Sequence, residues 1–274
     1  MGDRPSAAEA LTRRYGPDVN TGSIPTNDVI ELLLAHRTVR HFLPGEVDED
    51  TLAVLVAAAQ SASTSANLQL TSVVSIRDRA RRDRIATLAA DQQLIRDAGL
   101  FLIWVADWAR PSSVAERHGH PTDALDYIDS TISGVVDATL AAQNAAIAAE
   151  SLGYGVTFVG ALRNNVDAVC AELALPQRAF PLFGLAVGIP DPNDPAGIKP
   201  RLSQRVVLHR ERYTPVTDEL IEEYSQRINR YYTEQELPAD WVKDRLAWRV
   251  SAKDGLAGRR TMRQSLHTQG FPLR

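Results

Sequence analysis

The sequence is poor in cysteine, methionine and aromatic residues, and it has no excess of positive charge. Its 274 residues include one cysteine, two methionines and 6% aromatic residues, and 30 basic against 34 acidic residues give a formal net charge of −4. A single cysteine excludes an internal disulfide framework and fits a reducing compartment. The charge balance provides no global field to attract nucleic acid or an anionic membrane surface, so neither is expected as a partner.

Long hydrophobic runs are also missing. No segment reaches the about 18 consecutive apolar residues of a membrane span, and the start, Met1 to Ser6, lacks the apolar stretch of a signal peptide. We therefore expect a cytoplasmic protein. The lone Cys170 stands between Val169 and Ala171, which favours a buried structural thiol over a nucleophile.

The hydrophobic residues that are present make up 44% of the chain, which is enough for a sizeable core. Residues 1–25 are rich in Arg, Gly, Pro and Ser and show little periodicity, which predicts an N-terminal tail that is disordered or wraps a partner subunit. Residues 26–274 show no repeat or linker that would divide them, so we expect a single domain there.

Hydrophobic periodicity predicts helices that alternate irregularly with strands. Helices are expected over 27–35, 48–60, 78–88, 123–152, 166–173, 218–233 and from 241 onward, and strands over 72–76, 100–106, 156–159 and 182–188. Prolines predict loops over 107–122 and 190–200. The spacing is too irregular for a doubly wound sheet and favours an α+β fold with a central sheet between helices. In the long helix, one expected packing stripe contains Leu125, Ile128, Ile132, Val135, Thr139, Ala142, Ala146 and Ala149.

The most informative stretch is His36-Arg37-Thr38-Val39-Arg40, which places cations and a hydroxyl where the helix 27–35 is expected to end. Cations at a helix C-terminus complement the helix dipole, so these residues could simply be ordinary features of a helix end. Anion binding is the other interpretation. The remaining polar clusters decide between the two.

Three further clusters point to related chemistry. Residues 61–69 are rich in hydroxyls and amides, residues 159–161 form a turn of small residues, and Lys199-Pro200-Arg201 holds two cations on a rigid extended backbone. Cationic groups bind phosphate, hydroxyls suit a polyol, and the N–H groups of a small-residue turn can approach an isoalloxazine ring. Each cluster alone also fits a plain loop or surface segment, but their combination favours a flavin site.

Two other patterns carry less weight. His118 and His120, with Asp123 and Asp126 nearby, stand in a polar loop without a third strong ligand at suitable spacing, so no metal site is expected. The glycine-rich stretch that starts at Gly153-Tyr154-Gly155 and is followed by Gly160 comes after a helix and leads into a strand, the reverse of the order in a dinucleotide-binding turn. That order excludes a Rossmann site.

The order of these motifs resembles the oxygen-insensitive, FMN-dependent nitroreductases, in particular the NADPH-preferring bacterial nitroreductase and flavin reductase group. The resemblance extends from residue 28 to the C-terminus and is carried by five blocks. They are His-Arg-Thr-Val-Arg-His-Phe at 36–42, Ala-Gln-Asn-Ala-Ala-Ile-Ala-Ala-Glu-Ser-Leu-Gly at 142–153, Gly-Ala-Leu-Arg-Asn-Asn at 160–165, Leu-Phe-Gly-Leu-Ala-Val-Gly at 182–188 and Lys-Pro-Arg-Leu at 199–202.

The resemblance implies a three-layer α/β/α fold with a mostly antiparallel mixed central sheet flanked by helices. It also implies a homodimer with FMN at the subunit interface. The implied reaction is two-electron, ping-pong hydride transfer from NADPH or NADH to a small-molecule acceptor of the nitroaromatic or quinone type.

Carried over residue by residue, the resemblance implies three groups of FMN contacts. The phosphate and ribityl group is His36, Arg37, Thr38, Lys199 and Arg201. Arg40 would lie near N1 and O2 of the flavin and stabilise the charge of the reduced ring. The remaining contacts would come from Thr64, Ser65, Gln92, Phe158, Val159, Gly160 and Ala161. No side chain is expected to act as nucleophile or general base, because flavin N5 is the reacting centre.

The sequence departs from the family pattern at its flavin turn and its hydroxyl run. Gly160-Ala161 stands where two glycines are usual, and Phe158 stands where an aromatic hydroxyl is often found; flavin binding should survive both changes. Ala66 and Asn67 replace a serine and an aromatic residue, which should alter the acceptor pocket more than the cofactor site.

A third departure concerns the electron donor. The loop 233–240 carries Glu234, Glu236 and Asp240 where the family has arginines for the 2′-phosphate of NADPH, and repulsion of a dianion would weaken that preference. The C-terminal segment is basic, and its cations either supply a substitute or form a solvated helix face. These cations are Lys243, Arg245, Arg249, Lys253, Arg259, Arg260 and Arg263. A specialised flavin reductase and a non-catalytic flavin-binding dimer remain open as alternative functions.

Overall fold

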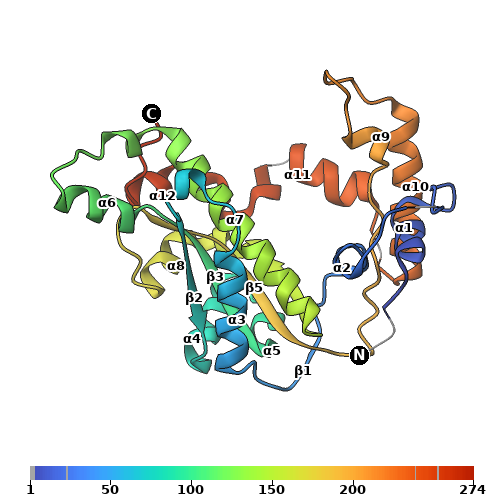
Figure 1. The fold of residues 1–274 in the computed structure, drawn as a ribbon, viewed down its shortest axis with the longest axis horizontal. Coiled ribbons are helices and arrows are strands. Elements are labelled where there is room, and N and C mark those ends of the chain that lie inside the picture. The colour runs from blue at the N-terminus through green and yellow to red at the C-terminus, as the bar shows by residue number, and fades with distance from the viewer. Residues whose placement is uncertain (1–3, 23, 238, 252) are drawn as a thin grey trace. The chain divides into compact units, whose positions relative to one another are not determined.

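The computed structural model describes residues 4–22, 24–237, 239–251 and 253–274, and the chain divides into two compact units (Figure 1). The first unit is drawn from Met1–Thr38 and Pro195–Leu256, and the second from Val39–Asp194 and Ala257–Arg274. Residues 1–3 and 23 of the expected tail and Pro238 of the acidic loop lie outside the described residues.

A five-stranded sheet forms the centre of the second unit. Its strands are β1 (Phe42–Leu43), β2 (Thr71–Ile76), β3 (Leu100–Asp107), β4 (Gly155–Val159) and β5 (Ala179–Pro190). β5 pairs with β3 and, on its other side, with β4, while β2 pairs with the far side of β3. These pairings and that of β1 with β5 are all antiparallel. β2 and β4 therefore lie on opposite sides of the central pair β3 and β5.

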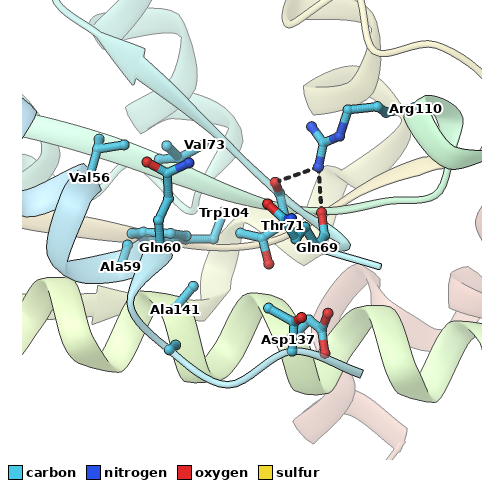
Figure 2. Close-up of a pocket in the computed structure, with 12 residues that line it drawn as sticks. Val56, Ala59, Gln60, Gln69, Thr71, Val73, Trp104, Arg110, Asp137 and Ala141 are labelled. Atoms are coloured by element: carbon cyan, nitrogen blue, oxygen red, sulfur yellow. Dashed lines mark hydrogen bonds between the residues drawn. The ribbon is translucent and has the colours of Figure 1, made fainter. Parts of the chain in front are cut away.

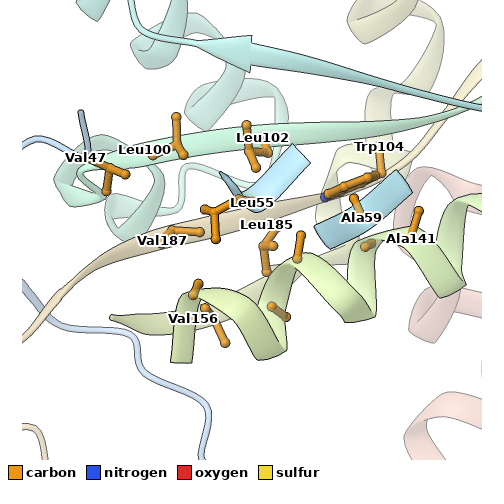
Figure 3. Packing of buried hydrophobic residues seen from close by; sticks show 14 residues of the cluster. Val47, Leu55, Ala59, Leu100, Leu102, Trp104, Ala141, Val156, Leu185 and Val187 are labelled. Carbon is orange, nitrogen blue, oxygen red and sulfur yellow. The ribbon is translucent and has the colours of Figure 1, made fainter. Parts of the chain in front are cut away.

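Helices cover both faces of this sheet, which confirms the three-layer α/β/α architecture. On one face α3 (Glu49–Gln60) and α7 (Ile128–Ser151) pack against each other and against Leu100, Leu102 and Trp104 of β3 (Figure 3). On the other face α4 (Arg79–Leu88), α5 (Gln93–Asp97) and α8 (Val166–Glu172) pack against Phe101 and Ile103. Alternate residues of β3 point to opposite faces, so the strand is buried along its whole length.

The expected packing stripe of α7 is correct in its C-terminal half and wrong in its N-terminal half. Ala142, Ala146 and Ala149 are buried, as expected. Ile128 and Ile132, in contrast, are both 53% exposed. The buried face of the first half runs instead through a different set of positions, which are Ser130, Gly134, Asp137 and Ala138. Gly134 belongs there because a Cβ would lie 3.1 Å from the indole nitrogen of Trp108, so this part of α7 approaches the sheet closely.

The expected loop 107–122 was wrong, because it contains helix α6 (Ala109–Arg117). Pro111 stands in the first turn of α6, where a missing N–H costs little. Asp107 accepts a hydrogen bond from the backbone N of Arg110 at 3.2 Å and thereby supports that turn. The short 3-10 turn η2 (Asp123–Asp126) precedes α7, which accordingly begins later than expected.

The first unit is helical in its described residues. It contains α1 (Ala7–Tyr15), α2 (Asp28–Ala35), α9 (Gln204–Val207), α10 (Asp218–Glu234), the π-helical turn η4 (Trp241–Ala247) and α11 (Trp248–Ser251). α1 lies where little regular structure was expected. Ser6 and Glu9 form a capping box at its start, in which each side chain bonds the backbone N of the other residue. The boundaries 1–25 and 26–274 stay predictions.

The second unit is completed by η1 (Ser65–Asn67), η3 (Gly160–Asn165) and α12 (Met262–Thr268), while η5 (Lys253–Thr261) crosses from the first unit to the second. Among the described helices, none combines the length and the apolar character needed to cross a membrane. Cys170 is buried on α8, and loss of hydration raises the pKa of its thiol to about 11. The expected burial of this thiol is confirmed.

Candidate functional site

The motif 36–40 is divided between the two units. His36 caps the C-terminus of α2 and leaves the helix with φ −48° and ψ 131°, so Arg37 follows outside the helix but within the first unit. Val39 belongs to the second unit, where it is 3% exposed and its backbone N donates to Val156 O at 3.0 Å. Thr157 Oγ1 donates to the carbonyl of Val39. The valine in the middle of the motif is therefore a core residue that bonds to β4.

Gly155 makes room for this valine. A Cβ at position 155 would lie 2.8 Å from Cβ, Cγ1 and Cγ2 of Val39, a separation that real Cβ atoms do not show. The glycine is needed here because of close packing, since its φ is not in the left-handed region. This packing role was not evident from the sequence.

The two segments that carry the predicted phosphate residues both belong to the first unit and are hydrogen-bonded to each other. Arg37 Nη1 donates to Ala196 O at 2.9 Å, which ties the motif to the segment that carries Lys199 and Arg201. The same segment is held against α10, because the hydroxyl of Tyr231 contacts both the N and the O of Gly197 at 3.1 Å. A cation of one segment is thus bonded to the backbone of the other, although the two are far apart in the sequence.

Arg40 lies in the second unit, with an exposed side chain and a fixed backbone. Asp194, whose side chain is 2% exposed, accepts from the backbone N of Arg40 at 3.2 Å and of His41 at 3.5 Å. Its other oxygen lies 3.4 Å from Nδ1 of His41. Asp194 is a positioning residue that the sequence analysis missed, because an acid in a proline-rich loop gives no local sign of such a role.

The hydroxyl run is fixed by a second buried acid that the sequence analysis missed. Asp137, 1% exposed on α7, accepts from N and Oγ of Ser65 and from the backbone N of Leu70. Between these two anchors Ala66, Asn67 and Gln69 have left-handed backbone, with φ of 49°, 57° and 54°. Consecutive left-handed residues other than glycine are strained, and such strain persists where surrounding contacts impose it.

A cavity of about 380 Å³ lies beside this run, between α3, β2 and α7 (Figure 2). Its wall includes Thr64 and Asp137, and Arg110 bounds it while donating to the carbonyls of Gln69 and Thr71. Trp104 also lines it, and its buried indole N–H has no hydrogen-bond partner among the described residues. The volume falls in the range of small-molecule pockets.

The expected flavin turn spans the end of β4, with Phe158 and Val159, and the start of η3, with Gly160 and Ala161. Phe158 is 40% exposed, and its ring packs edge-on against that of Phe183 with 5.4 Å between the ring centroids. Val159, in contrast, is 2% exposed. Because its side chain is buried, Val159 would contact a ligand through its backbone groups. Gly160 is crowded, since a Cβ there would lie 3.3 Å from Arg163 Nη2. The turn accordingly exposes an aromatic ring beside a backbone that bears no bulky side chain.

Arg259 braces the flavin turn from the C-terminal segment. Its Nη2 donates to Gly160 O at 3.1 Å and its Nε donates to Asn164 Oδ1 at 2.9 Å. The chain comes so close here that a Cβ on Gly258 would lie 1.8 Å from Asn164 O. Arg259 was considered as a cation of a basic segment, and the structure gives it a structural contact with the turn.

The structure does not bring the hydroxyl run and the flavin turn together within one chain. Val159 is in register with Gly184, Gly184 with Ile103, and Ile103 with Val74 on β2, so three strand spacings separate the two edges. At about 4.8 Å per spacing this is roughly 14 Å, and the hydroxyl run precedes β2. Gln92 lies elsewhere, at the N-cap of α5, with its amide donating to Ala89 O at 3.1 Å.

The acids of the loop 233–240 are of two kinds. Glu234 and Glu236 are exposed, as expected for residues that could repel a phosphate. Asp240 instead caps η4, and the hydrogen bond from the backbone N of Lys243 at 2.9 Å lowers the pKa of its carboxyl. Across the described ranges, no group of three or more His, Cys, Asp or Glu side chains could hold a metal ion.

Comparisons with known proteins agree with this geometry. Residues 33–189 match the model of the nitroreductase family, and residues 199–274 match that of the nitroreductase family, C-terminal domain. The chain belongs to the nitroreductase family.

Individual relatives give the same result. The chain is 37% identical over 203 residues to the oxygen-insensitive NADPH nitroreductase of Salmonella typhimurium, covering 74% of this chain and 82% of the relative. It is 36% identical over 213 residues to an FMN reductase (NADPH) of Bacillus subtilis, covering 76% and 85%. The solved structure of NfrA2 of B. megaterium superposes with a TM-score of 0.85 at 31% identity, covering 91% of this chain and 100% of that one. The predicted nitroreductase fold is confirmed.

Proposed function

We propose that the protein is an FMN-dependent NAD(P)H oxidoreductase that reduces nitroaromatic or quinone-type acceptors by two-electron transfer. The observation that carries the proposal is the region of the first unit where Arg37 bonds the segment of Lys199 and Arg201. Relatives named as an NADPH nitroreductase and an FMN reductase support the same chemistry.

The residues present fit the phosphate and ribityl chain of FMN. His36, Arg37, Lys199 and Arg201 offer imidazole, guanidinium and ammonium groups, and Thr38 adds a hydroxyl. Planar guanidinium groups bind phosphate oxygens in pairs and ammonium groups act as point charges, so the set suits a dianion. The 3-10 turn at Gly160 fits the ring, since it presents backbone at a position without a Cβ.

When bound, FMN supplies a ring that accepts and returns a hydride at N5. The chain's own residues bind FMN, orient its ring and tune its reduction. Arg40 stabilises negative charge near N1 and O2, which favours the reduced ring. Phe158, Val159, Gly160 and Ala161 face the N5 side, and Gln92 contacts the pyrimidine edge. No side chain transfers a proton as a general base.

The proposed enzyme is a homodimer in which a second copy supplies Thr64 and Ser65 to the flavin. Two features of the second unit support this. The hydroxyl run and the flavin turn belong to opposite edges of the sheet, so one copy leaves the flavin contacts incomplete. α7 also exposes apolar residues that a second copy would cover, namely Ile128, Ile132, Val135, Val136 and Leu140. The cytoplasmic location stays a prediction.

Purification tests the proposal directly. We expect a yellow, dimeric protein that releases FMN on denaturation and bleaches when NADPH or NADH is added without oxygen. Adding a nitroaromatic compound, a quinone or air should then restore the colour at acceptor-dependent rates. A colourless protein that takes up no added FMN contradicts the proposal, and a yellow protein that neither donor bleaches supports the non-catalytic flavin-binding alternative.

A flavin reductase on the same scaffold is the second candidate, favoured by the relative named as an FMN reductase. Steady-state kinetics distinguishes the two activities. A flavin reductase gives a higher kcat/KM with free FMN than with nitroaromatic compounds or quinones, whereas a nitroreductase gives the opposite order. We expect the strained run at 66–69 and the adjoining cavity to determine which acceptor this protein prefers.

A further inference from the structure

The N-terminal helix α1 contains an arginine with an unusual environment. Arg14 is 6% exposed, although arginine is among the residues least often buried. α1 precedes the residues that match the family models, which begin at residue 33. A buried cation needs partners that carry negative charge or partial negative charge, and the contacts of Arg14 identify such partners.

Arg14 binds the C-terminal end of α2. Its Nε donates to Leu34 O at 3.0 Å and its Nη2 donates to His36 O at 2.9 Å. The last carbonyls of a helix lack partners within the helix and carry partial negative charge, so a guanidinium is well suited to them. The eight residues of α2 include no basic side chain of their own, and Arg14 fills that role.

Arg14 also binds the second cationic segment, through its backbone. The backbone N of Arg201 donates to Arg14 O at 2.8 Å. From the other side Nη2 of Arg227 on α10 reaches Arg201 O at 3.4 Å. One residue of α1 therefore holds both His36 and Arg201, which are 165 residues apart in the sequence.

We propose that Arg14 is a positioning residue for FMN, which holds the two phosphate-binding segments at the spacing that the phosphate requires. This inference rests on the proposed function of the site. Arg37 and Arg201, one in each segment, carry charges of the same sign. The hydrogen bonds that Arg14 donates to His36 O and accepts from Arg201 N join the two segments without an anion, so the site is arranged before the cofactor arrives.

A comparison of FMN with riboflavin tests the proposal, because riboflavin lacks the phosphate. The protein, freed of flavin, is titrated with each compound and binding is followed by quenching of flavin fluorescence. Arg14→Met keeps much of the side-chain volume and removes the donors. Arg13→Met is the matched control, since Arg13 is the adjacent exposed arginine of the same helix.

We expect Arg14→Met to raise the Kd for FMN at least about tenfold, because the His36 segment then loses both charge-assisted hydrogen bonds that the guanidinium donates. The Kd for riboflavin should change by less than about twofold, and Arg13→Met should leave both values within that range. An equal rise in the Kd for FMN and for riboflavin would show general destabilisation and overturn the proposal. An unchanged Kd for FMN would also overturn it. Should Arg14→Met fail to fold, Arg14→Lys, which lacks the planar fork, is judged by the same ratio.

The phosphate site and the role of Arg14 can be disproved separately. A wild-type protein that does not prefer FMN to riboflavin overturns the phosphate site and the role of Arg14 together. A wild-type protein that prefers FMN, with an Arg14→Met variant that keeps the full preference, overturns the role of Arg14 alone.

Discussion

The buried carboxylate of Asp137 accepts two hydrogen bonds from Ser65, one from the backbone N at 2.9 Å and one from Oγ at 2.8 Å. Its second oxygen accepts from Leu70 N at 3.2 Å. A single acid on α7 thus fixes both ends of the strained segment that directly follows Thr64 and Ser65, the proposed flavin hydroxyls. The position of that segment depends on a residue 72 positions away from Ser65.

Replacing Asp137 with Asn should destabilise the protein by about 1–3 kcal/mol, because an amide NH₂ would face a backbone N–H that loses its acceptor. Urea denaturation measures the change. Asp129→Asn is the control, since Asp129 is an exposed acid in the first turn of the same helix. A variant of Asp137 as stable as this control would contradict the proposed anchoring.

Gly155→Ala should cost about 1–3 kcal/mol of stability, because the new methyl group collides with Val39. Val39→Ala in the same chain removes two of the three close contacts, so the double variant should lose less than the sum of the single ones. Gly22→Ala, where a Cβ has an ordinary contact at 3.5 Å, is the control. Strict additivity of Gly155→Ala and Val39→Ala would show that the two residues do not compete for space.

Arg201→Ala should weaken FMN binding by about tenfold or more, since a guanidinium that binds phosphate is lost. Phe158→Ala should have a much smaller effect, because the ring packs on Phe183 and leaves the backbone of the turn in place. Retention of FMN through gel filtration and a fluorescence titration compare the two variants. Equal retention would count against the assignment of the phosphate site.

Glu234→Gln together with Glu236→Gln should lower the KM for NADPH by about two- to fivefold and leave that for NADH unchanged, because the loss of two exposed charges acts on the 2′-phosphate through water. The effect should shrink as salt is added. Glu223→Gln, at an exposed position of α10, is the control. The same change in KM for both donors would show that the loop does not recognise the 2′-phosphate.

Cys170 should make the protein less stable at alkaline pH. Its thiol has a pKa raised from 9.0 to about 11 in the folded protein, so between these pH values the unfolded chain loses a proton that the folded one keeps. The free energy of unfolding therefore falls as pH rises through this window and is independent of this group only well below pH 9. By pH 10 the loss should be about 1 kcal/mol. Cys170→Ala should show a correspondingly weaker decrease between pH 8 and pH 10, and an identical decrease would refute the assignment.

Local elements followed well from the sequence. The helices expected to start at residues 27, 48 and 78 are α2, α3 and α4, which each begin one residue later with Asn27, Asp48 or Asp78 as the N-cap, and the apolar run 100–106 lies in the buried strand β3. These features depend on hydrogen bonds and periodicities that span a few residues. Neither α1 nor α6 was expected, although each begins with a short-range feature of helix starts. That feature is a capping box in α1 and a proline in the first turn in α6.

The sequence by itself determined which residue types could bind a flavin phosphate, since His36 to Arg40 and Lys199 to Arg201 carry the necessary cations in any fold. The tertiary structure decided how these residues are used. It buries Val39 against Gly155, which divides the motif between the two units. It also places Arg14 at the C-terminal end of α2, where one interpretation of the sequence had placed the motif's own cations. These contacts join residues far apart in the chain through buried hydrogen bonds and close packing, which no local pattern encodes.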